Sequence, residues 1–139
     1  MDDLSGEGMC VIDLDTVMPG LALYDFGDMV RAGTSPAEED EVDLSKVFMR
    51  FSMYEALLRG YVSATGSVLT EAELYHLPLS GMVITLEVGM RFLTDYLEGD
   101  VYFKTRRPEH NLERCRNQFK LVSSMEEQMD SMKDLLKTL

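Results

Sequence analysis

Two patterns of apolar spacing divide the chain. Residues 9–14 (Met-Cys-Val-Ile-Asp-Leu) form a short apolar run behind the turn-forming residues 5–8, which predicts a buried strand. A strand needs a partner, and a hairpin with residues 1–4 would be marginal on its own. From residue 21 onwards, apolar positions recur at intervals of three and four, which is the spacing of helices with one buried face.

Capping and turn residues delimit the first two predicted helices. After a Pro-Gly break, residues 21–31 are expected to form a short helix. Residues 32–46 are turn-rich and strongly acidic, so we expect an exposed loop there. Ser52 and Glu55 form a Ser-x-x-Glu capping box for a second helix, which should run to about Thr65 before a glycine ends it.

Two further helices are predicted on either side of Pro78. Thr70 and Glu73 form another capping box, for a short helix that the proline should end. Residues 79–98 should form a longer, apolar helix that stops at Gly99.

Close packing is indicated along the predicted helix 79–98, because it contains Gly81 and Gly89. A last helix should begin near Pro108 and continue to the C-terminus, with an amphipathic stripe of residues three and four apart. Methionine is a frequent gap-filler in cores, so we interpret the stripe as core rather than as a binding groove. The stripe consists of Leu112, Cys115, Phe119, Val122, Met125, Met129, Met132 and Leu136.

Together these elements predict a mainly α fold, with one short N-terminal strand or hairpin followed by about five helices. The 139 residues are the length of one domain, and an apolar fraction of 45% is enough for a buried core. The formal net charge of −12 disfavours nucleic acids and anionic membranes as partners, because both bind basic patches.

Cysteine use and hydropathy predict a cytoplasmic protein. Cys10 and Cys115 have no metal-ligand spacing, and we expect both to be reduced, buried thiols; a single disulfide between them is the alternative. The acidic, polar N-terminus is unlike a signal or transit peptide. No apolar run reaches the roughly 18 residues that a membrane span requires.

The aspartates of the apolar N-terminal run are the strongest candidates for chemistry. Asp13 and Asp15 form an Asp-x-Asp pattern at the end of the predicted strand. A carboxylate fixed at a strand end can hold Mg²⁺ against nucleotide phosphates, as phosphoryl-transfer enzymes require. The alternative is a strand-end turn in which either carboxylate accepts backbone N–H bonds.

Three separated segments carry a resemblance to a known family. They are residues 12–20 (Ile-Asp-Leu-Asp-Thr-Val-Met-Pro-Gly), 89–100 (Gly-Met-Arg-Phe-Leu-Thr-Asp-Tyr-Leu-Glu-Gly-Asp) and 108–112 (Pro-Glu-His-Asn-Leu). In this order they resemble the aminoglycoside phosphotransferase and choline kinase-like family, and within it most of all the N-acetylhexosamine 1-kinase branch. Residues 23–26 (Leu-Tyr-Asp-Phe) are similar to the family's helix-opening motif, although the family's Asp-Pro before it is missing here.

The resemblance implies a fold and a set of roles. The fold would be part of the C-terminal lobe of a protein-kinase-like (α+β) phosphotransferase. Asp13 would be the magnesium-binding aspartate, with Asp15 as a second and weaker candidate. Asp25 would brace the catalytic loop, although it stands in a literal Asp-Phe-Gly. Arg91 and Tyr102 match positions that line the sugar site of hexosamine kinases; the alternative is a surface arginine and a capped core tyrosine.

Phosphoryl transfer by this fold needs three parts that the sequence does not contain. They are a loop over the phosphates, a strand lysine with its helix glutamate, and a catalytic loop of the form H-x-D-x-x-x-x-N. In the family that loop closely precedes the metal aspartate, so we expect the catalytic base to lie upstream of Met1 and no catalytic residue to lie within the chain. Residues 1–139 would then be a partial C-terminal lobe without the N-terminal lobe, and inactive as an enzyme on its own.

Two functions from different classes follow from these patterns. The first is a C-terminal fragment of an ATP- and Mg²⁺-dependent kinase that phosphorylates a hydroxyl of a small sugar, in the family's terms an N-acetylhexosamine. The alternative is a non-catalytic, acidic helical interaction protein that reuses a kinase-lobe scaffold, and a weaker third option is a divalent-ion binder. An uncovered strand edge at residues 9–14 should pair with a neighbouring copy, which predicts a closed homo-oligomer.

Overall fold

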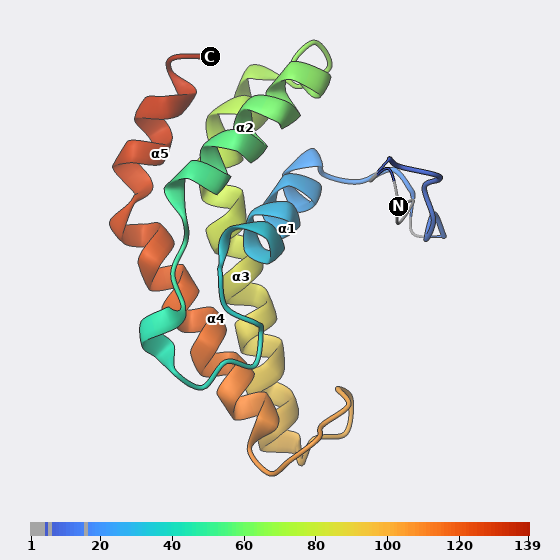
Figure 1. Cartoon of the computed structure of the whole chain (residues 1–139), viewed down its shortest axis with the longest axis vertical. Helices are drawn as coiled ribbons and strands as arrows, with labels where there is room; N and C mark the ends of the chain where they lie inside the picture. Colours follow the sequence, from blue (N-terminus) through green and yellow to red (C-terminus); the bar gives the residue numbers. More distant parts are fainter. Residues whose placement is uncertain (1–4, 6, 16) are drawn as a thin grey trace.

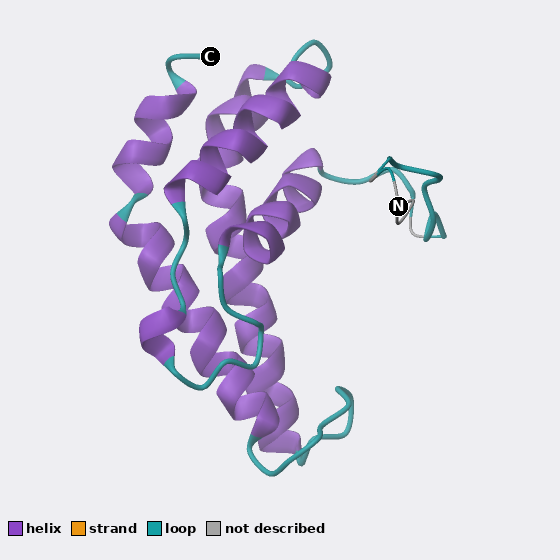
Figure 2. Ribbon diagram, viewed as in Figure 1, coloured by secondary structure: helices purple, strands orange, loops and turns teal. Residues whose placement is uncertain are grey.

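The computed structural model describes residues 5, 7–15 and 17–139, and its regular structure is entirely helical (Figures 1 and 2). The prediction of a mainly α fold is therefore confirmed. The elements in chain order are α1 (Ala22–Thr34), a short 3-10 turn η1 (Leu44–Lys46), α2 (Phe51–Thr65), α3 (Glu71–Glu98), α4 (His110–Glu127) and α5 (Met129–Leu136).

The predicted strand at residues 9–14 is wrong, since none of the described residues is in a strand. Residues 7–15 and 17–20, here called the N-terminal arm, extend from the start of α1 away from the helical body (Figure 1). A strand requires a second backbone to pair with, and the helices offer none. Asp13 also has φ 63°, in the left-handed region, which interrupts an extended run. The alternative hairpin partner, from Met1 to residue 4, lies outside the described residues.

The first two helices differ slightly from the prediction. α1 continues three residues beyond the predicted end. α2 begins at Phe51 with Arg50 as its N-cap, so the predicted capping box at Ser52 is wrong. The reason is a contact between the two helices: the backbone N–H of Arg50 donates to the carbonyl of Thr34 at 3.1 Å, and its guanidinium donates to the same oxygen at 3.2 Å. Glu55 instead pairs with Arg59 at 2.9 Å.

The central helix α3 merges two predicted helices. Its capping box is confirmed, because Thr70 Oγ1 accepts from the backbone N–H of Glu73 and the Glu73 carboxylate accepts from that of Thr70. Its end at Gly99 is confirmed too, with φ 95°. Pro78, however, does not end the helix. The proline is buried, and packing on both sides of α3 outweighs the one backbone hydrogen bond that it removes.

Close helix contacts explain the glycines. α1 and α4 both pack along α3, and the predicted role of Gly81 and Gly89 is confirmed. A Cβ on Gly81 would lie 2.6 Å from Val30 Cγ1, and one on Gly89 would lie 2.8 Å from the Phe119 ring. Gly27 of α1 is equally confined from the other side.

The predicted last helix is divided at Gln128 into α4 and α5. The Gln128 amide donates to the carbonyls of Met49 and Ser124, at 3.0 and 3.1 Å, and so ties the break to the segment before α2. The buried core runs along these helices and includes the stripe residues Met125 and Met132. Its members are Phe26, Val30, Val47, Met49, Tyr54, Leu58, Leu77, Leu121, Met125 and Met132.

By length and composition α3 could also cross a membrane, with a mean hydropathy of 1.2. This is weak support for a span, because core helices of soluble proteins pass the same test. α3 has α1 and α4 packed along it and contains the buried Asp95. Of its most apolar 18-residue window 39% is buried, and this packing is compatible with a soluble protein.

Candidate functional site

The connection from α3 to α4 is held by a buried carboxylate. Gly99 and Asp100 both have positive φ and reverse the chain after α3. Asp95, one turn earlier, is 3% exposed and accepts hydrogen bonds from the backbone N–H groups of Tyr102 at 2.7 Å and Phe103 at 2.9 Å. The buried amide of Asn111 donates to Asp95 and to Asp100, each at 2.8 Å. These bonds fix the position of residues 99–103 on the end of α3.

The same contacts determine the charge of Asp95. Burial acts to raise the pKa of this carboxyl, but the hydrogen bonds from the backbones of Phe103 and Tyr102 and from the Asn111 amide outweigh it and hold the pKa below its usual value. Asp95 is therefore ionised at neutral pH, and its charge is satisfied by donors from the connection.

Arg91 and Tyr102, the two predicted sugar-site residues, lie against each other at this end of α3. The Arg91 guanidinium is 3.5 Å from the Tyr102 hydroxyl and lies 5.6 Å from the centre of the Tyr102 ring and 5.5 Å from that of Phe103. Arg91 also approaches Glu87 at 3.8 Å, one turn back on the helix. Both predicted residues remain exposed enough to meet a ligand.

A pocket of about 290 Å³ opens beside this pair. Its lining combines an aromatic face with hydroxyl, carboxylate and guanidinium groups, which is a suitable set for a small polyhydroxylated molecule. The lining residues are Arg91, Thr94, Asp95, Glu98, Tyr102 and Phe103. Here this is called the Arg91–Tyr102 pocket.

The predicted metal ligands lie elsewhere. Asp13 and Asp15 are exposed on the N-terminal arm, and neither lines the Arg91–Tyr102 pocket. Within residues 5, 7–15 and 17–139, no group of three or more His, Cys, Asp or Glu side chains could hold a metal ion. Magnesium often takes only one or two protein carboxylates together with substrate phosphates. The assignment of Mg²⁺ to Asp13 therefore stays a prediction.

Asp25 lies exposed in the first turn of α1. An acidic residue there is favoured by the helix dipole. Its charge also adds to burial in raising the pKa of Tyr61. Its predicted role as a brace for a catalytic loop concerns a segment that this sequence does not contain, and it stays a prediction.

The catalytic base was predicted to lie upstream of Met1. Met1 is outside the described residues, so the structure does not bear on what precedes it. The placement of the base upstream of Met1 therefore stays a prediction as well.

A second polar contact, between the acidic loop and the start of α4, was missed by the sequence analysis. His110 is fully buried; its Nδ1 accepts the backbone N–H of Arg106 at 3.2 Å, and its Nε2 lies 2.9 Å from the Asp40 carboxylate. The first contact assigns the proton to Nε2, which then donates to Asp40. The Asn117 amide donates to the carbonyls of Glu38 and Glu41. We call this group the His110–Asp40 clasp.

The clasp corrects the prediction that residues 32–46 form a simply exposed loop. Thr34 is buried, and Asp40 is only partly exposed. A signal was present in the sequence: Asn111, Asn117 and Gln118 fall on the inner side of α4, where buried amides must find partners. Their partners could not be named, because the partners of His110 and Asn117 come from a loop 70 and 79 residues away.

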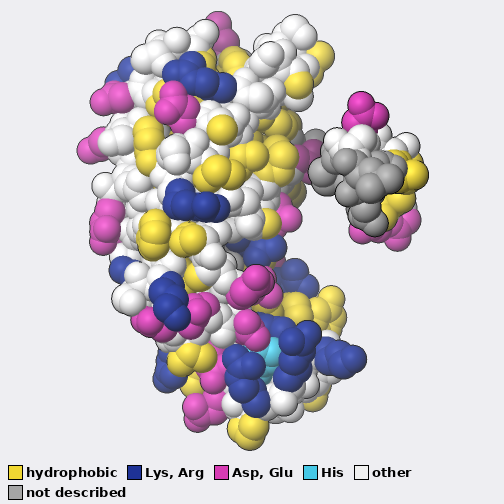
Figure 3. Space-filling model, in the orientation of Figure 1, with side chains coloured by type: hydrophobic (Ala, Val, Ile, Leu, Met, Phe, Trp, Pro, Cys, Tyr) yellow, Lys and Arg dark blue, Asp and Glu magenta, His cyan; other side chains and the backbone are white. Residues whose placement is uncertain are grey.

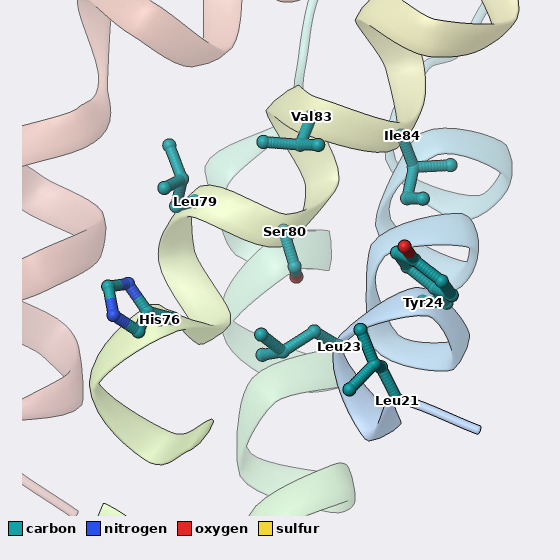
Figure 4. Close-up of a pocket in the computed structure, with 8 residues that line it drawn as sticks. All are labelled: Leu21, Leu23, Tyr24, His76, Leu79, Ser80, Val83 and Ile84. Atoms are coloured by element: carbon teal, nitrogen blue, oxygen red, sulfur yellow. The ribbon is translucent and has the colours of Figure 1, made fainter. Parts of the chain in front are cut away.

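An apolar pocket of about 170 Å³ lies between the start of α1 and the first half of α3 (Figure 4). Leu21, Leu23 and Tyr24 reach it from the α1 side, and Leu79 and Val83 from α3. The N-terminal arm joins the body beside it, at Leu21. The pocket could receive an apolar side chain, and it lacks the polar groups of the Arg91–Tyr102 pocket.

No protein-family model matches the chain. The resemblance to phosphotransferases therefore rests on the three sequence segments that carry it.

Proposed function

We propose that the chain supplies the acceptor-binding part of an ATP-dependent phosphotransferase that acts on a hydroxyl of a small sugar, with N-acetylhexosamines as the first candidates. The observation that carries the proposal is the contact between Arg91 and Tyr102 beside a polar pocket. The resemblance selected these two residues without any knowledge of how the chain folds, and they are eleven positions apart. Their convergence supports the sugar-site assignment over two unrelated structural residues.

Each group in the pocket has a part in binding. The guanidinium of Arg91 donates to ring or hydroxyl oxygens, and the Glu98 carboxylate accepts from sugar hydroxyls. The Tyr102 ring offers an apolar face, and its hydroxyl offers both a donor and an acceptor. Asp95 acts indirectly, because it accepts a hydrogen bond from the backbone N–H of Tyr102 and holds that residue in place.

The chain by itself is proposed to bind the acceptor without transferring phosphate. The sequence contains no catalytic H-x-D-x-x-x-x-N loop, and positioning supplies most of the catalysis in this class of reaction. We expect no ATP consumption stimulated by N-acetylhexosamine above a buffer blank. Stimulated consumption that disappears in Asp13→Ala would contradict this part of the proposal. In the complete enzyme Mg²⁺ would bridge the nucleotide phosphates, with Asp13 as its predicted ligand.

Acceptor binding is tested by titrating the ¹⁵N-labelled chain with N-acetylglucosamine and following amide shifts. We expect saturable shifts around the Arg91–Tyr102 pocket that vanish in Tyr102→Ala and are weakened in Tyr102→Phe, which keeps the ring. Tyr75→Ala is the matched control, because Tyr75 is an equally exposed tyrosine near the other end of α3. Shifts that do not saturate, or that survive Tyr102→Ala, would refute the sugar site.

The alternative function, a non-catalytic interaction protein, is favoured by a different observation. The pocket at the start of α1 is lined mainly by apolar side chains, with Tyr24, His76 and Ser80 as its polar members (Figure 4). If a protein partner docks there, Val83→Asp should weaken its binding, whereas the affinity for a sugar should not change. The two functions are therefore distinguished by two substitutions: Tyr102→Ala should abolish sugar binding, and Val83→Asp should abolish binding of a protein partner.

We further infer a cytoplasmic location from the two thiols. Both cysteines are free. Cys115 is buried as predicted, and burial raises its pKa, whereas Cys10 is exposed, so the prediction that it is buried is wrong. An exposed free thiol is typical of a reducing compartment.

A further inference from the structure

Basic side chains are concentrated at one end of this acidic protein. The chain has 13 Lys and Arg residues against 25 Asp and Glu residues. Figure 3 nevertheless shows Lys and Arg side chains gathered at the end of the molecule where α3 passes into α4. A pocket of about 440 Å³ lies at this end, between α1, α3, the connection and α4, and four basic residues line it. They are Arg31, Arg91, Lys104 and Arg114.

The two acidic residues of this pocket form ion pairs with Arg31. Asp28 and Glu39 also line it, and each is 2.8 Å from the guanidinium of Arg31. Arg31 and its two partners therefore form a closed group with a net charge of −1. Lys104 and Arg114 form no ion pair with any described residue, although the charge of Arg114 helps to lower the pKa of Asp40.

Arg114 is held in position and has a donor to spare. Its guanidinium lies 5.4 Å from the centre of the Phe92 ring, and its Nη1 donates to the Lys104 carbonyl at 3.3 Å and to Asn111 at 3.2 Å. Its Nε is buried and has no hydrogen-bond partner among the described residues. A ligand cannot reach this buried atom, but Nη2 forms no hydrogen bond with a described residue and is not buried, so it can donate to a ligand in the pocket.

We propose that this pocket, called here the cationic pocket, binds a phosphate dianion through Arg114 and Lys104, with Arg91 at its edge. A phosphate group presents several acceptor oxygens, which suits the planar fork of a guanidinium beside the point charge of an ammonium. The ligand is either free inorganic phosphate or the phosphate of a small monoester, since both present the same group. The inference does not depend on the proposed sugar site, although Arg91 lines both pockets.

The test is a titration of the ¹⁵N-labelled chain with sodium phosphate at neutral pH, with the ionic strength held constant by sodium chloride. We expect saturable amide shifts around Lys104 and Arg114. Lys104→Gln should weaken binding about tenfold, the effect of losing one charge-assisted hydrogen bond. Arg116→Gln is the matched control, because Arg116 is exposed on the same helix as Arg114 and does not line the pocket.

A second arm with glycerol 3-phosphate separates the two sources of the ligand. Tighter binding of the monoester assigns the pocket to a phosphorylated metabolite, and tighter binding of phosphate assigns it to the free ion. Non-saturating shifts with both ligands would overturn the proposal, and so would equal affinity of Lys104→Gln and wild type. Arg114 also supports the fold, so Lys104→Gln, whose circular dichroism should match the wild type, is the deciding variant. Failure of sugar binding alone would leave these outcomes unchanged.

Discussion

Two non-helical segments of this protein carry predicted site residues, and they behave in opposite ways. The N-terminal arm contains Asp13, and its described residues are all exposed. The connection between α3 and α4, residues 99–109, contains Tyr102 and is fixed through Asp95, Asn111 and the clasp at His110. The arm is the more apolar of the two, yet only the polar connection is held against the helices by hydrogen bonds.

The difference shows what positions an irregular segment. Burial of apolar side chains is favourable only when a partner surface covers them, and none of the described residues covers the arm. Backbone N–H groups need acceptors, and a buried carboxylate that accepts two of them fixes the local geometry. A site residue in an irregular segment is therefore positioned when buried polar groups accept hydrogen bonds from the backbone around it.

The largest expected effect comes from removing the Asn111 amide, which joins Asp95 of α3 to Asp100 of the connection. Asn111→Ala removes the buried amide that donates to both Asp95 and Asp100, so we expect a loss of about 3 kcal/mol in the free energy of unfolding. Ile12→Ala is the matched change in the arm, where a 78% exposed side chain should alter stability by less than about 0.5 kcal/mol. Urea unfolding measures both. Equal losses would show that the arm is as firmly attached as the connection.

Glycine substitutions should give the same contrast on a smaller scale. Gly99 has φ 95°, so Gly99→Ala forces a side chain into the left-handed region and should cost about 1–2 kcal/mol. Gly8 in the arm has nothing within 4 Å of an added Cβ and no positive φ, so Gly8→Ala should leave the unfolding midpoint unchanged. Thermal unfolding of the two variants decides the matter. A stable Gly99→Ala protein would mean that the connection does not depend on this turn.

How far the sequence could predict these features depends on how local their causes are. The capping box at Thr70 and the stop at Gly99 were predicted correctly, because both depend on residues within one turn. The strand at residues 9–14 was wrong, because pairing requires a second strand. The helix end predicted at Pro78 was wrong, because packing along α3 keeps the helix continuous through the proline. The clasp was missed, since its two sides meet across about seventy residues.

The candidate site shows the same limit. The resemblance brought Arg91 and Tyr102 into the prediction, and the fold places them in contact. Neither the role of the Asp95 carboxylate, which holds the connection, nor the meeting of Lys104 and Arg114 in one pocket could be derived from spacing. Both depend on how α3, the connection and α4 converge.

Acid should weaken the connection and not the arm. The hydrogen bond from His110, with Arg107 nearby, holds the pKa of Asp40 below its usual value in spite of partial burial. A lowered pKa contributes stability above the ordinary value of about 4, and this is lost as the pH falls through the folded-state pKa. Asp40→Asn should therefore lose less stability than wild type when the pH is lowered from about 6 to about 3. Asp15→Asn, which alters an exposed arm carboxylate, should follow the wild type in urea unfolding at both pH values.

The smallest effect on stability is expected from deleting the arm, and this deletion also tests self-association. Removal of residues 1–18 takes away no described core residue, so the free energy of unfolding of the helical body should change by less than about 0.5 kcal/mol. The arm largely exposes Met9, Val11 and Ile12, and such a surface favours burial against another copy. Sedimentation equilibrium at micromolar concentration should then show a closed oligomer for the intact chain and a monomer for the deletion. If both forms sediment as monomers, the predicted homo-oligomer through residues 9–14 is wrong. Protection of those amides from hydrogen exchange in such a monomer would mean that the arm packs against its own helices. The arm and the connection would then both be fixed to the fold.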